Sequence, residues 1–256
     1  MNNFDDLLYQ EAKASENLCR DCKSLDDCKQ SEPGFVRFVD CSGVIAIKRC
    51  DRYKTAATNR EFKRYFAFSR IPQRFLNFPL DKFQVDNHNS KAVWAVNQIR
   101  QSGIDGLNGF VFYGPVGTGK TLCSCLIASE VIRQGKTAIY SSVPNLFQEL
   151  RDGLSSGNFE QMIEKINSCQ CLVLDDLGSE RLTEWVGEKL FSIIDYRYAN
   201  NLFTVITSNY NYENLKKRLS VFDKDDISAV RIMSRLKAMC SFIEIGGTDR
   251  RTNCRF

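Results

Sequence analysis

The sequence has no apolar run long enough to span a bilayer, and its first residues are acidic and polar, unlike a signal peptide. We therefore expect a cytoplasmic protein without a membrane partner. It also has no internal repeat and no low-complexity tract. Histidine is nearly absent: His88 is the only one, and we expect it to lie on the surface rather than to bind a metal.

The composition is that of an ordinary globular protein, with 43% hydrophobic residues in 256. The formal net charge is only +4, and it is unevenly distributed. Residues 1–55 carry 9 basic and 10 acidic side chains, whereas the rest carry 26 and 21. The larger part is therefore the basic one, which permits contact with nucleic acid without requiring it.

The most informative stretch is a phosphate-binding loop that follows an apolar segment at 109–113 and precedes an apolar, helical pattern at 122–132. Its glycines let successive N–H groups face a polyphosphate, and the helix N-terminus adds partial positive charge. A lysine at its end can reach the β- and γ-phosphates, and the following hydroxyl can bind Mg²⁺. The loop consists of Gly114, Pro115, Val116, Gly117, Thr118, Gly119, Lys120 and Thr121.

Two acidic residues end the next strongly apolar strand, at 171–178. We expect Asp175 to hold Mg²⁺ through water and Asp176 to orient or deprotonate the attacking water. A further strand, 202–209, ends in polar residues that would emerge beside the γ-phosphate if the strands are parallel. There Asn209 is a candidate ligand for that phosphate or the water, or the N-cap of the next helix.

A helix is expected over 226–236, with Ile227, Val230 and Met233 at three-residue spacing. Arg231 and Arg235 are four residues apart and share a face. Such an arginine can stabilise charge on the nucleotide of a neighbouring subunit, or simply form a solvated basic face.

Strands near 110, 138, 172 and 204 alternate with helices, which predicts a doubly wound α/β fold with its ligand at the carboxyl edge of a parallel sheet. The helices after the loop are expected near 143–152, 158–168, 183–199 and 225–239.

Five of the eleven cysteines lie in the first fifty residues. Cys19 and Cys22 have the spacing of adjacent zinc ligands, and a metal would stabilise a module too small to bury a sufficient core. We favour Cys28 and Cys50 as the other ligands, with Cys41 as the alternate. The other interpretation is reduced structural cysteines without metal. The remaining six are expected to be small buried side chains, at 123, 125, 169, 171, 240 and 254.

Residues 59–78 interleave five basic with six aromatic residues. This composition suits a surface that stacks bases, but a helical linker docked on the following domain is the favoured interpretation. We therefore divide the chain into a cysteine module (1–55), a basic and aromatic linker (56–80) and a nucleotide-binding domain (81–256).

These motifs together resemble the bacterial replicative-helicase loaders of the DnaC/DnaI family, AAA+ ATPases related to DnaA and to the IstB transposition helpers. The resemblance runs from about Ile71 to the C-terminus. It includes the phosphate-binding loop and the segments at 71–75, 174–178, 194–198, 207–209, 231–236 and 246–250.

The resemblance implies ATP hydrolysis with Mg²⁺ at Lys120, Thr121, Asp175 and Asp176, with Asn209 as the phosphate sensor. It makes Arg235 the first candidate for an arginine finger, Arg231 the second, and Arg250 a replacement for a sensor arginine on the helical lid, which we expect to be incomplete.

As partners, the resemblance implies the hexameric replicative helicase at the zinc-containing cysteine module, and other subunits of the same protein. It also implies single-stranded DNA near 143–169, where Arg151 and Lys165 lie. Two alternatives are a transposition helper ATPase and a non-catalytic adaptor switched by nucleotide. A small-molecule kinase is disfavoured because we find no acceptor site or closing lid.

Overall fold

The protein divides into two compact units, Met1–Arg64 and Tyr65–Phe256. This is a computed structural model, and it describes residues 35–39, 45–49, 63–76, 78, 85–179, 183–220 and 227–250. All five N-terminal cysteines therefore lie outside the described residues, as does Cys254.

In the first unit, β1 (Phe35–Val39) pairs with β2 (Ile45–Arg49) in an antiparallel hairpin, with Phe35 opposite Arg49. The side chain of Val36 is buried.

The second unit is built on a parallel five-stranded sheet with the order β4-β5-β6-β3-β7. Every residue of β5 and β6 is buried, as expected for central strands covered on both faces. The edge strands β4 and β7 have mixed burial. The five strands are β3 (Gly109–Tyr113), β4 (Ala138–Ser142), β5 (Cys171–Asp175), β6 (Phe203–Ser208) and β7 (Cys240–Glu244).

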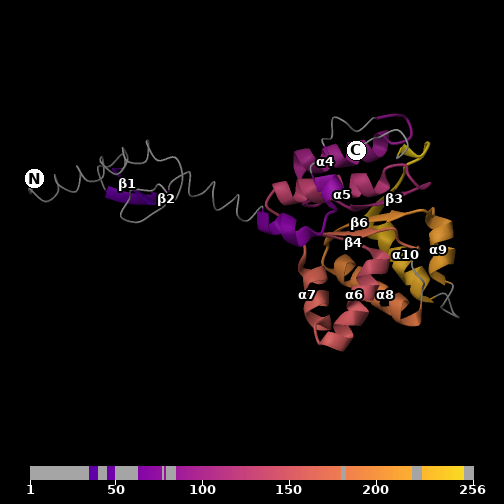
Figure 1. The fold of residues 1–256 in the computed structure, drawn as a ribbon. Coiled ribbons are helices and arrows are strands. Elements are labelled where there is room, and N and C mark those ends of the chain that lie inside the picture. The colour runs from indigo at the N-terminus through magenta and orange to yellow at the C-terminus, as the bar shows by residue number, and fades with distance from the viewer. Residues whose placement is uncertain are drawn as a thin grey trace, which may run out of the picture. The chain divides into compact units, whose positions relative to one another are not determined.

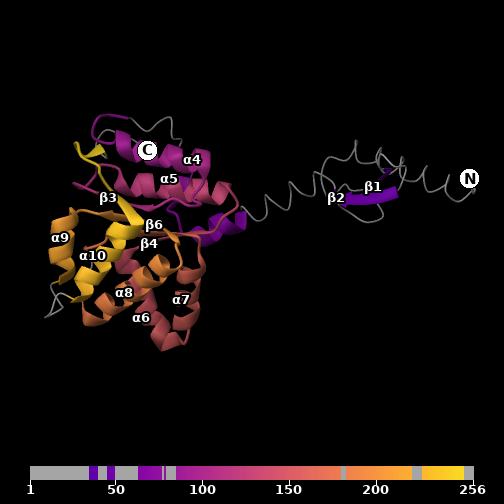
Figure 2. The ribbon, with the colours of Figure 1, turned by 180° about the vertical axis from the view of Figure 1, so that it is seen from behind.

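Helices cover both faces of this sheet, which confirms the doubly wound α/β fold (Figures 1 and 2). On one face, α5 (Lys120–Arg133) packs on the strands and is covered in turn by α4 (Ser90–Ser102) and α3 (Gln73–Leu76). Because α5 is enclosed in this way, its residues are buried on nearly all sides.

The helices of the other face surround a large apolar core. Within it α8 packs on α10, α7 on α6 and α8, and α9 on α10. Their bounds are α6 (Val143–Ser156), α7 (Phe159–Ser168), α8 (Glu184–Ala199), α9 (Tyr212–Leu219) and α10 (Ile227–Met239).

Two elements were absent from the sequence prediction, α4 and the fifth strand β7, and α9 was indicated only by the possible helix cap at Asn209. β7 starts directly after the last residue of α10, so no turn signal separates them. Of the three apolar residues that the sequence spaces along α10, Ile227 and Val230 are exposed and Met233 is buried. The buried side of α10 consists of Ala229, Ile232, Met233 and Leu236.

The cysteines described in the second unit are buried and reduced, which confirms their predicted role as small core side chains. Burial raises the pKa of the Cys123, Cys171 and Cys240 thiols to about 12. They are therefore neutral and inert at ordinary pH.

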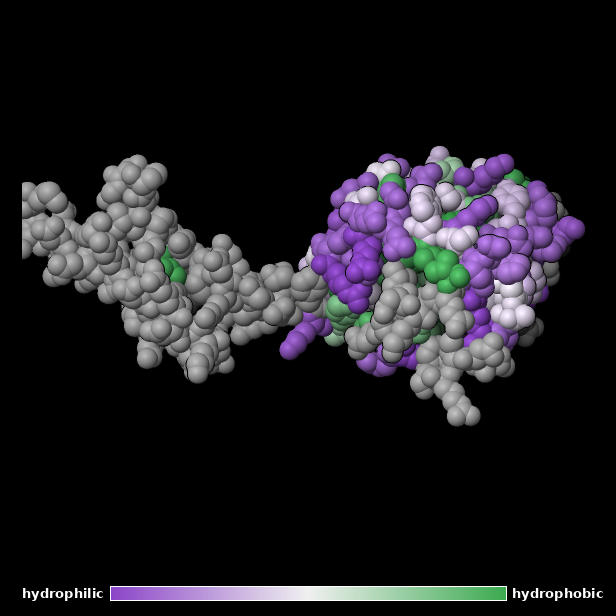
Figure 3. Space-filling view, turned by 90° about the horizontal axis from the view of Figure 1, so that it is seen from above, coloured by the Kyte–Doolittle hydropathy of each residue, from purple (hydrophilic) through white to green (hydrophobic). Residues whose placement is uncertain are grey.

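The surface of the second unit in Figure 3 is mainly hydrophilic, with a confined apolar area. In the part of the chain that the structure describes, no helix combines the length and apolar character needed to cross a bilayer.

Candidate nucleotide site

The phosphate-binding loop joins the carboxyl end of β3 to the N-terminus of α5, the position that the sequence predicted. It has the backbone that only glycine adopts freely: φ is 140° at Gly114 and 83° at Gly117. It is also tightly enclosed. A Cβ on Gly114 would lie 2.3 Å from the carbonyl oxygen of Ile245, and one on Gly117 would lie 2.1 Å from Oδ1 of Asp249. Larger residues at these two positions would distort the loop.

Lys120, the first residue of α5, is buried, and its ammonium group is turned onto the loop itself. Its Nζ donates hydrogen bonds to the carbonyl oxygens of Gly114 (2.8 Å) and Pro115 (2.7 Å). A phosphate oxygen is a charged and therefore stronger acceptor than either carbonyl. The lysine is held where it can exchange these bonds for bonds to a nucleotide.

Asp175 at the end of β5 is buried and accepts hydrogen bonds from three hydroxyl groups. Thr121 donates to Oδ1 at 2.9 Å and to Oδ2 at 3.2 Å, and Thr207 at the end of β6 donates to Oδ1 at 2.6 Å. The third donor is Tyr140 of β4, at 2.7 Å from Oδ2. The sequence prediction missed Tyr140, because it lies 35 residues before Asp175 on another strand and no sequence motif connects the two.

The Tyr140 phenol is a permanent donor in this network. Burial raises its pKa, and the neighbouring Asp175 carboxylate raises it further. The phenol therefore stays protonated throughout the neutral range and cannot turn into an acceptor that would repel the carboxylate.

Asp176 lies beside this network in a left-handed conformation, with φ of 63°. Its N–H donates to Oγ1 of Thr207 at 2.8 Å, and Nδ2 of Asn209 donates to its Oδ1 at 2.8 Å. The ends of β5 and β6 thus bring the two acids and Asn209 together. Asn209 is not the N-cap of α9, however. That position belongs to Asn211, whose side chain accepts from the N–H of Asn214.

A segment after β7 packs against the loop from the other side. The N–H of Arg250 donates to the carbonyl oxygen of Gly117 at 3.0 Å, and its side chain pairs with Asp86. The N–H of Gly246 donates to the carbonyl oxygen of His88 at 3.1 Å. Arg250 therefore lies next to the loop, while Asp86 and His88 are neighbours of the site that the sequence prediction missed.

The candidate arginine fingers lie elsewhere in the chain. Arg235 forms an ion pair with Asp195 and lies over the rings of Phe191 and Tyr198, all on α8. Arg231 also lies over Phe191. Among the described contacts of these arginines, none is to the phosphate-binding loop.

The residues present at the loop suit Mg²⁺. The Thr121 hydroxyl and the Asp175 carboxylate are hard oxygen ligands, which this ion prefers. A carboxylate has about four lone-pair sites, and the three hydroxyls leave room for one metal-bound water. Within the described ranges, the nucleotide site included, no group of three or more His, Cys, Asp or Glu side chains could hold a metal ion. The predicted zinc ligands at 19, 22, 28, 41 and 50 lie outside those ranges.

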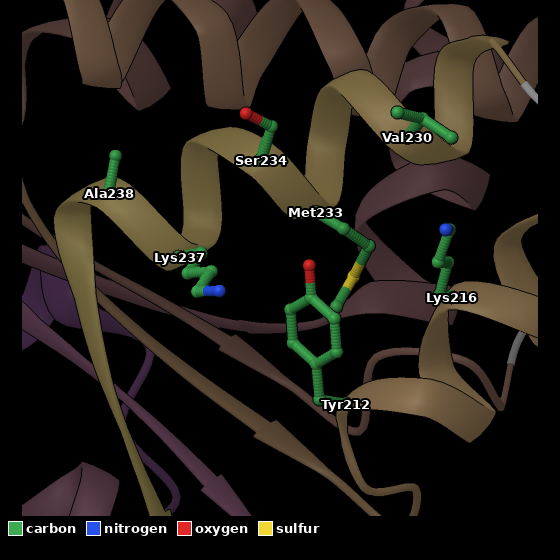
Figure 4. A pocket seen from close by; sticks show the side chains of 7 residues that line it. All are labelled: Tyr212, Lys216, Val230, Met233, Ser234, Lys237 and Ala238. Carbon is green, nitrogen blue, oxygen red and sulfur yellow. The ribbon is translucent and has the colours of Figure 1, made fainter.

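A separate pocket of about 320 Å³ lies between α9 and α10 (Figure 4). It contains none of the residues of the phosphate-binding loop or the acid pair. Its walls are formed by Tyr212, Lys216, Val230, Met233, Ser234, Lys237 and Ala238.

The parallel sheet, the glycine loop between β3 and α5, and the acids at the end of β5 define an ATP-binding protein of the AAA+ P-loop class. Within that class, the chain belongs to the IstB-like ATP binding protein family, which matches residues 45–255.

Two curated relatives show how the chain is related within this class. It is 28% identical over 147 residues to the replicative helicase loader DnaI of Bacillus subtilis, a match that covers 56% of this chain and 47% of the loader. It is 35% identical over 95 residues to an ATP-binding protein of insertion sequence IS1162 from Pseudomonas fluorescens, covering 37% and 41%. The matches thus span less than half of each relative.

Among solved structures, a crystal structure of DnaI matches with a TM-score of 0.62 at 28% identity, over 69% of this chain and 95% of that one. The resemblance to the DnaC/DnaI loaders that the motifs indicated is confirmed at the level of sequence and fold.

Proposed function

We propose that this protein is an ATP-dependent loader that binds the replicative DNA helicase and helps to place it on single-stranded DNA during replication initiation or restart. The observation that carries this proposal is the likeness of its ATPase domain to the DnaI loader in both sequence and structure. The nucleotide site described above supplies the groups that such a role needs.

In this proposal the protein hydrolyses ATP. Lys120 binds the β- and γ-phosphates, and Thr121 and Asp175 hold the Mg²⁺ of the nucleotide, which neutralises phosphate charge when bound. Asp176 accepts a proton from the attacking water or orients it, and Asn209 contacts the γ-phosphate or that water. The 2.8 Å bond between Asn209 and Asp176 supports a joint role for these two side chains.

Self-association through the ATPase domain would complete the site. Arg235, or Arg231 beside it, would then stabilise transition-state charge on the nucleotide of a neighbouring subunit. The exposed apolar side chains Ile227 and Val230 on the same helix support a contact surface at α10. Arg250, which borders the loop of its own chain, would take the part of a sensor arginine.

Single-stranded DNA would bind along α6 and α7, which pack on each other and form a helical pair (Figure 1). Arg151 of α6 and Lys165 of α7 are exposed and supply positive charge there. Arg151 also lies over the ring of Trp185, which anchors its stem.

The cysteine module (1–55) would bind the helicase, stabilised by zinc at Cys19, Cys22, Cys28 and Cys50, with Cys41 as the alternate ligand. In the sequence, the β1–β2 hairpin lies between Cys28 and Cys50, and its strand pairing is evidence for a small folded module here. Zinc quantification on the full chain and on a Cys19→Ser variant tests this part directly.

The loader proposal is tested with the full chain and the hexameric replicative helicase of the same cell. We expect a complex in gel filtration, and helicase transfer to single-stranded DNA that is lost in Lys120→Ala and in Asp176→Asn. A chain that forms no complex with the helicase would overturn the proposal. Transfer that survives in Asp176→Asn but not in Lys120→Ala would instead indicate a nucleotide-switched adaptor without catalysis.

The second candidate is a transposition helper ATPase, favoured by the family match and by the IS1162 relative. It predicts cooperative binding to duplex DNA and to a transposase. Duplex binding without affinity for the helicase would decide in its favour.

A further inference from the structure

Tyr140 connects the edge strand β4 to the magnesium side of the proposed site. In the sheet it is paired with Val173 of β5, two residues before Asp175. Its phenol therefore extends along the sheet toward the carboxyl edge, where the hydroxyl donates to Oδ2 of Asp175 at 2.7 Å. The ring is half-buried, so this contact is made largely out of water.

The two oxygens of Asp175 are held by different donors. Thr207 and Thr121 both donate to Oδ1, at 2.6 and 2.9 Å. Oδ2 receives the short bond from Tyr140 and only a long one, 3.2 Å, from Thr121. Tyr140 is therefore the main donor to Oδ2, whereas the two threonines hold Oδ1.

We propose that Tyr140 is a positioning residue for Mg²⁺-nucleotide, which acts by holding Oδ2 of Asp175 in the orientation that receives a metal-bound water. This inference rests on the proposed role of Asp175 in binding Mg²⁺. Groups that hydrogen-bond to a metal-binding carboxylate orient it and tune its affinity, and their loss costs about 10- to 100-fold in metal affinity.

The experiment is a titration of the full chain with a fluorescent ATP analogue, at a series of Mg²⁺ concentrations and in EDTA. For Tyr140→Phe we expect the Mg²⁺ concentration that gives half of the metal-dependent gain in affinity to rise about tenfold. The affinity in EDTA should stay as in the wild type, because the phenylalanine keeps the ring and the loop is untouched.

The matched control is Tyr212→Phe. The Tyr212 hydroxyl points into the pocket between α9 and α10 (Figure 4), and the walls of that pocket include neither Asp175 nor Asp176. This variant should match the wild type in both conditions. A melting curve without nucleotide checks that Tyr140→Phe is folded.

A double-mutant cycle separates positioning from a general effect on structure. In an Asp175→Asn background, Tyr140→Phe should cause no further change in the Mg²⁺ dependence. Tyr140 is proposed to act only by orienting the Asp175 carboxylate, and that carboxylate is absent from this background. An equal loss of affinity with and without Mg²⁺, or an unchanged Mg²⁺ dependence in Tyr140→Phe, would overturn the inference. If the wild type itself binds nucleotide without any response to Mg²⁺, the proposed metal role of Asp175 fails as well.

Discussion

Nδ2 of Asn209 donates a hydrogen bond of 2.8 Å to Oδ1 of Asp176, across the ends of two neighbouring parallel strands. The proposed base and the proposed phosphate sensor are therefore in direct contact. A γ-phosphate that engages the Asn209 amide would compete directly with the carboxylate. We infer that occupancy of the site and the orientation of its base are linked through this one side chain.

Replacing Asn209 by alanine should reduce ATP hydrolysis about 100-fold while nucleotide affinity changes little, because one preorganised polar contact to the reacting groups is lost. The measurement is steady-state phosphate release together with a nucleotide titration. Asn211→Ala is the matched control: it removes only the cap of α9 and should cost about 1 kcal/mol of stability with turnover retained. Equal turnover in the Asn209→Ala variant and the wild type would contradict the assignment.

Gly117→Ala should weaken nucleotide binding about tenfold or more, since even 1.4 kcal/mol of strain in the bound loop corresponds to a factor of ten. Its φ of 83° disfavours a side chain, and the new Cβ would collide with Asp249. Gly135 has a similar φ of 78° but open space around it. Gly135→Ala should therefore lower stability by only about 1 kcal/mol and leave binding intact. Urea unfolding and nucleotide titration of both variants check this, and equal affinities would refute it.

Arg197→Met should destabilise the fold by about 3 kcal/mol, because it leaves buried acceptors without a donor. The guanidinium is completely buried. It donates to Oγ1 of Thr204 at 2.9 Å and to the carbonyl oxygens of Phe203 and Ile166 at 2.8 and 2.9 Å. It thereby ties α7, α8 and β6 together.

The control for that change is Arg133→Met, which removes only a surface pair with Glu130 and should cost about 0.5 kcal/mol or less. Urea denaturation measures both values. If the two variants lose the same free energy of unfolding, the network around Arg197 has no special role in stability.

The stability of the protein should fall as the pH rises above 9. Folding raises the pKa of the Cys123, Cys171 and Cys240 thiols from 9.0 to about 12. As the pH rises, the unfolded chain therefore loses these protons at a lower pH than the folded protein does. The contribution of the neutral thiols to the free energy of unfolding is complete below pH 9 and is lost between pH 9 and 12. Each thiol can contribute a slope of about 1.4 kcal/mol per pH unit in that window. Unfolding curves at several pH values should show a shallower decline in Cys171→Ala, and an identical slope would contradict this account.

The sequence alone was sufficient for the class of fold and for the placement of the phosphate-binding loop and the acid pair at the ends of their strands. The loop and the acid pair are contiguous motifs next to strongly apolar strands, so local physics places them at strand ends. By the same reasoning Asn209 was expected near the γ-phosphate position. The sequence also allowed Asn209 to cap the next helix, but in the structure Asn211 has that role.

Tertiary structure alone decided which distant side chains complete the site. Tyr140 reaches Asp175 only because β4 pairs with β5 in one particular register. Arg250 meets Asp86 and Gly117 only because β7 joins the sheet beside β3. Neither pairing leaves a periodic signal, since strand order and register depend on which apolar faces pack together over the whole chain. The phosphate-binding loop is therefore a local property of this sequence, whereas its surroundings are a property of the fold.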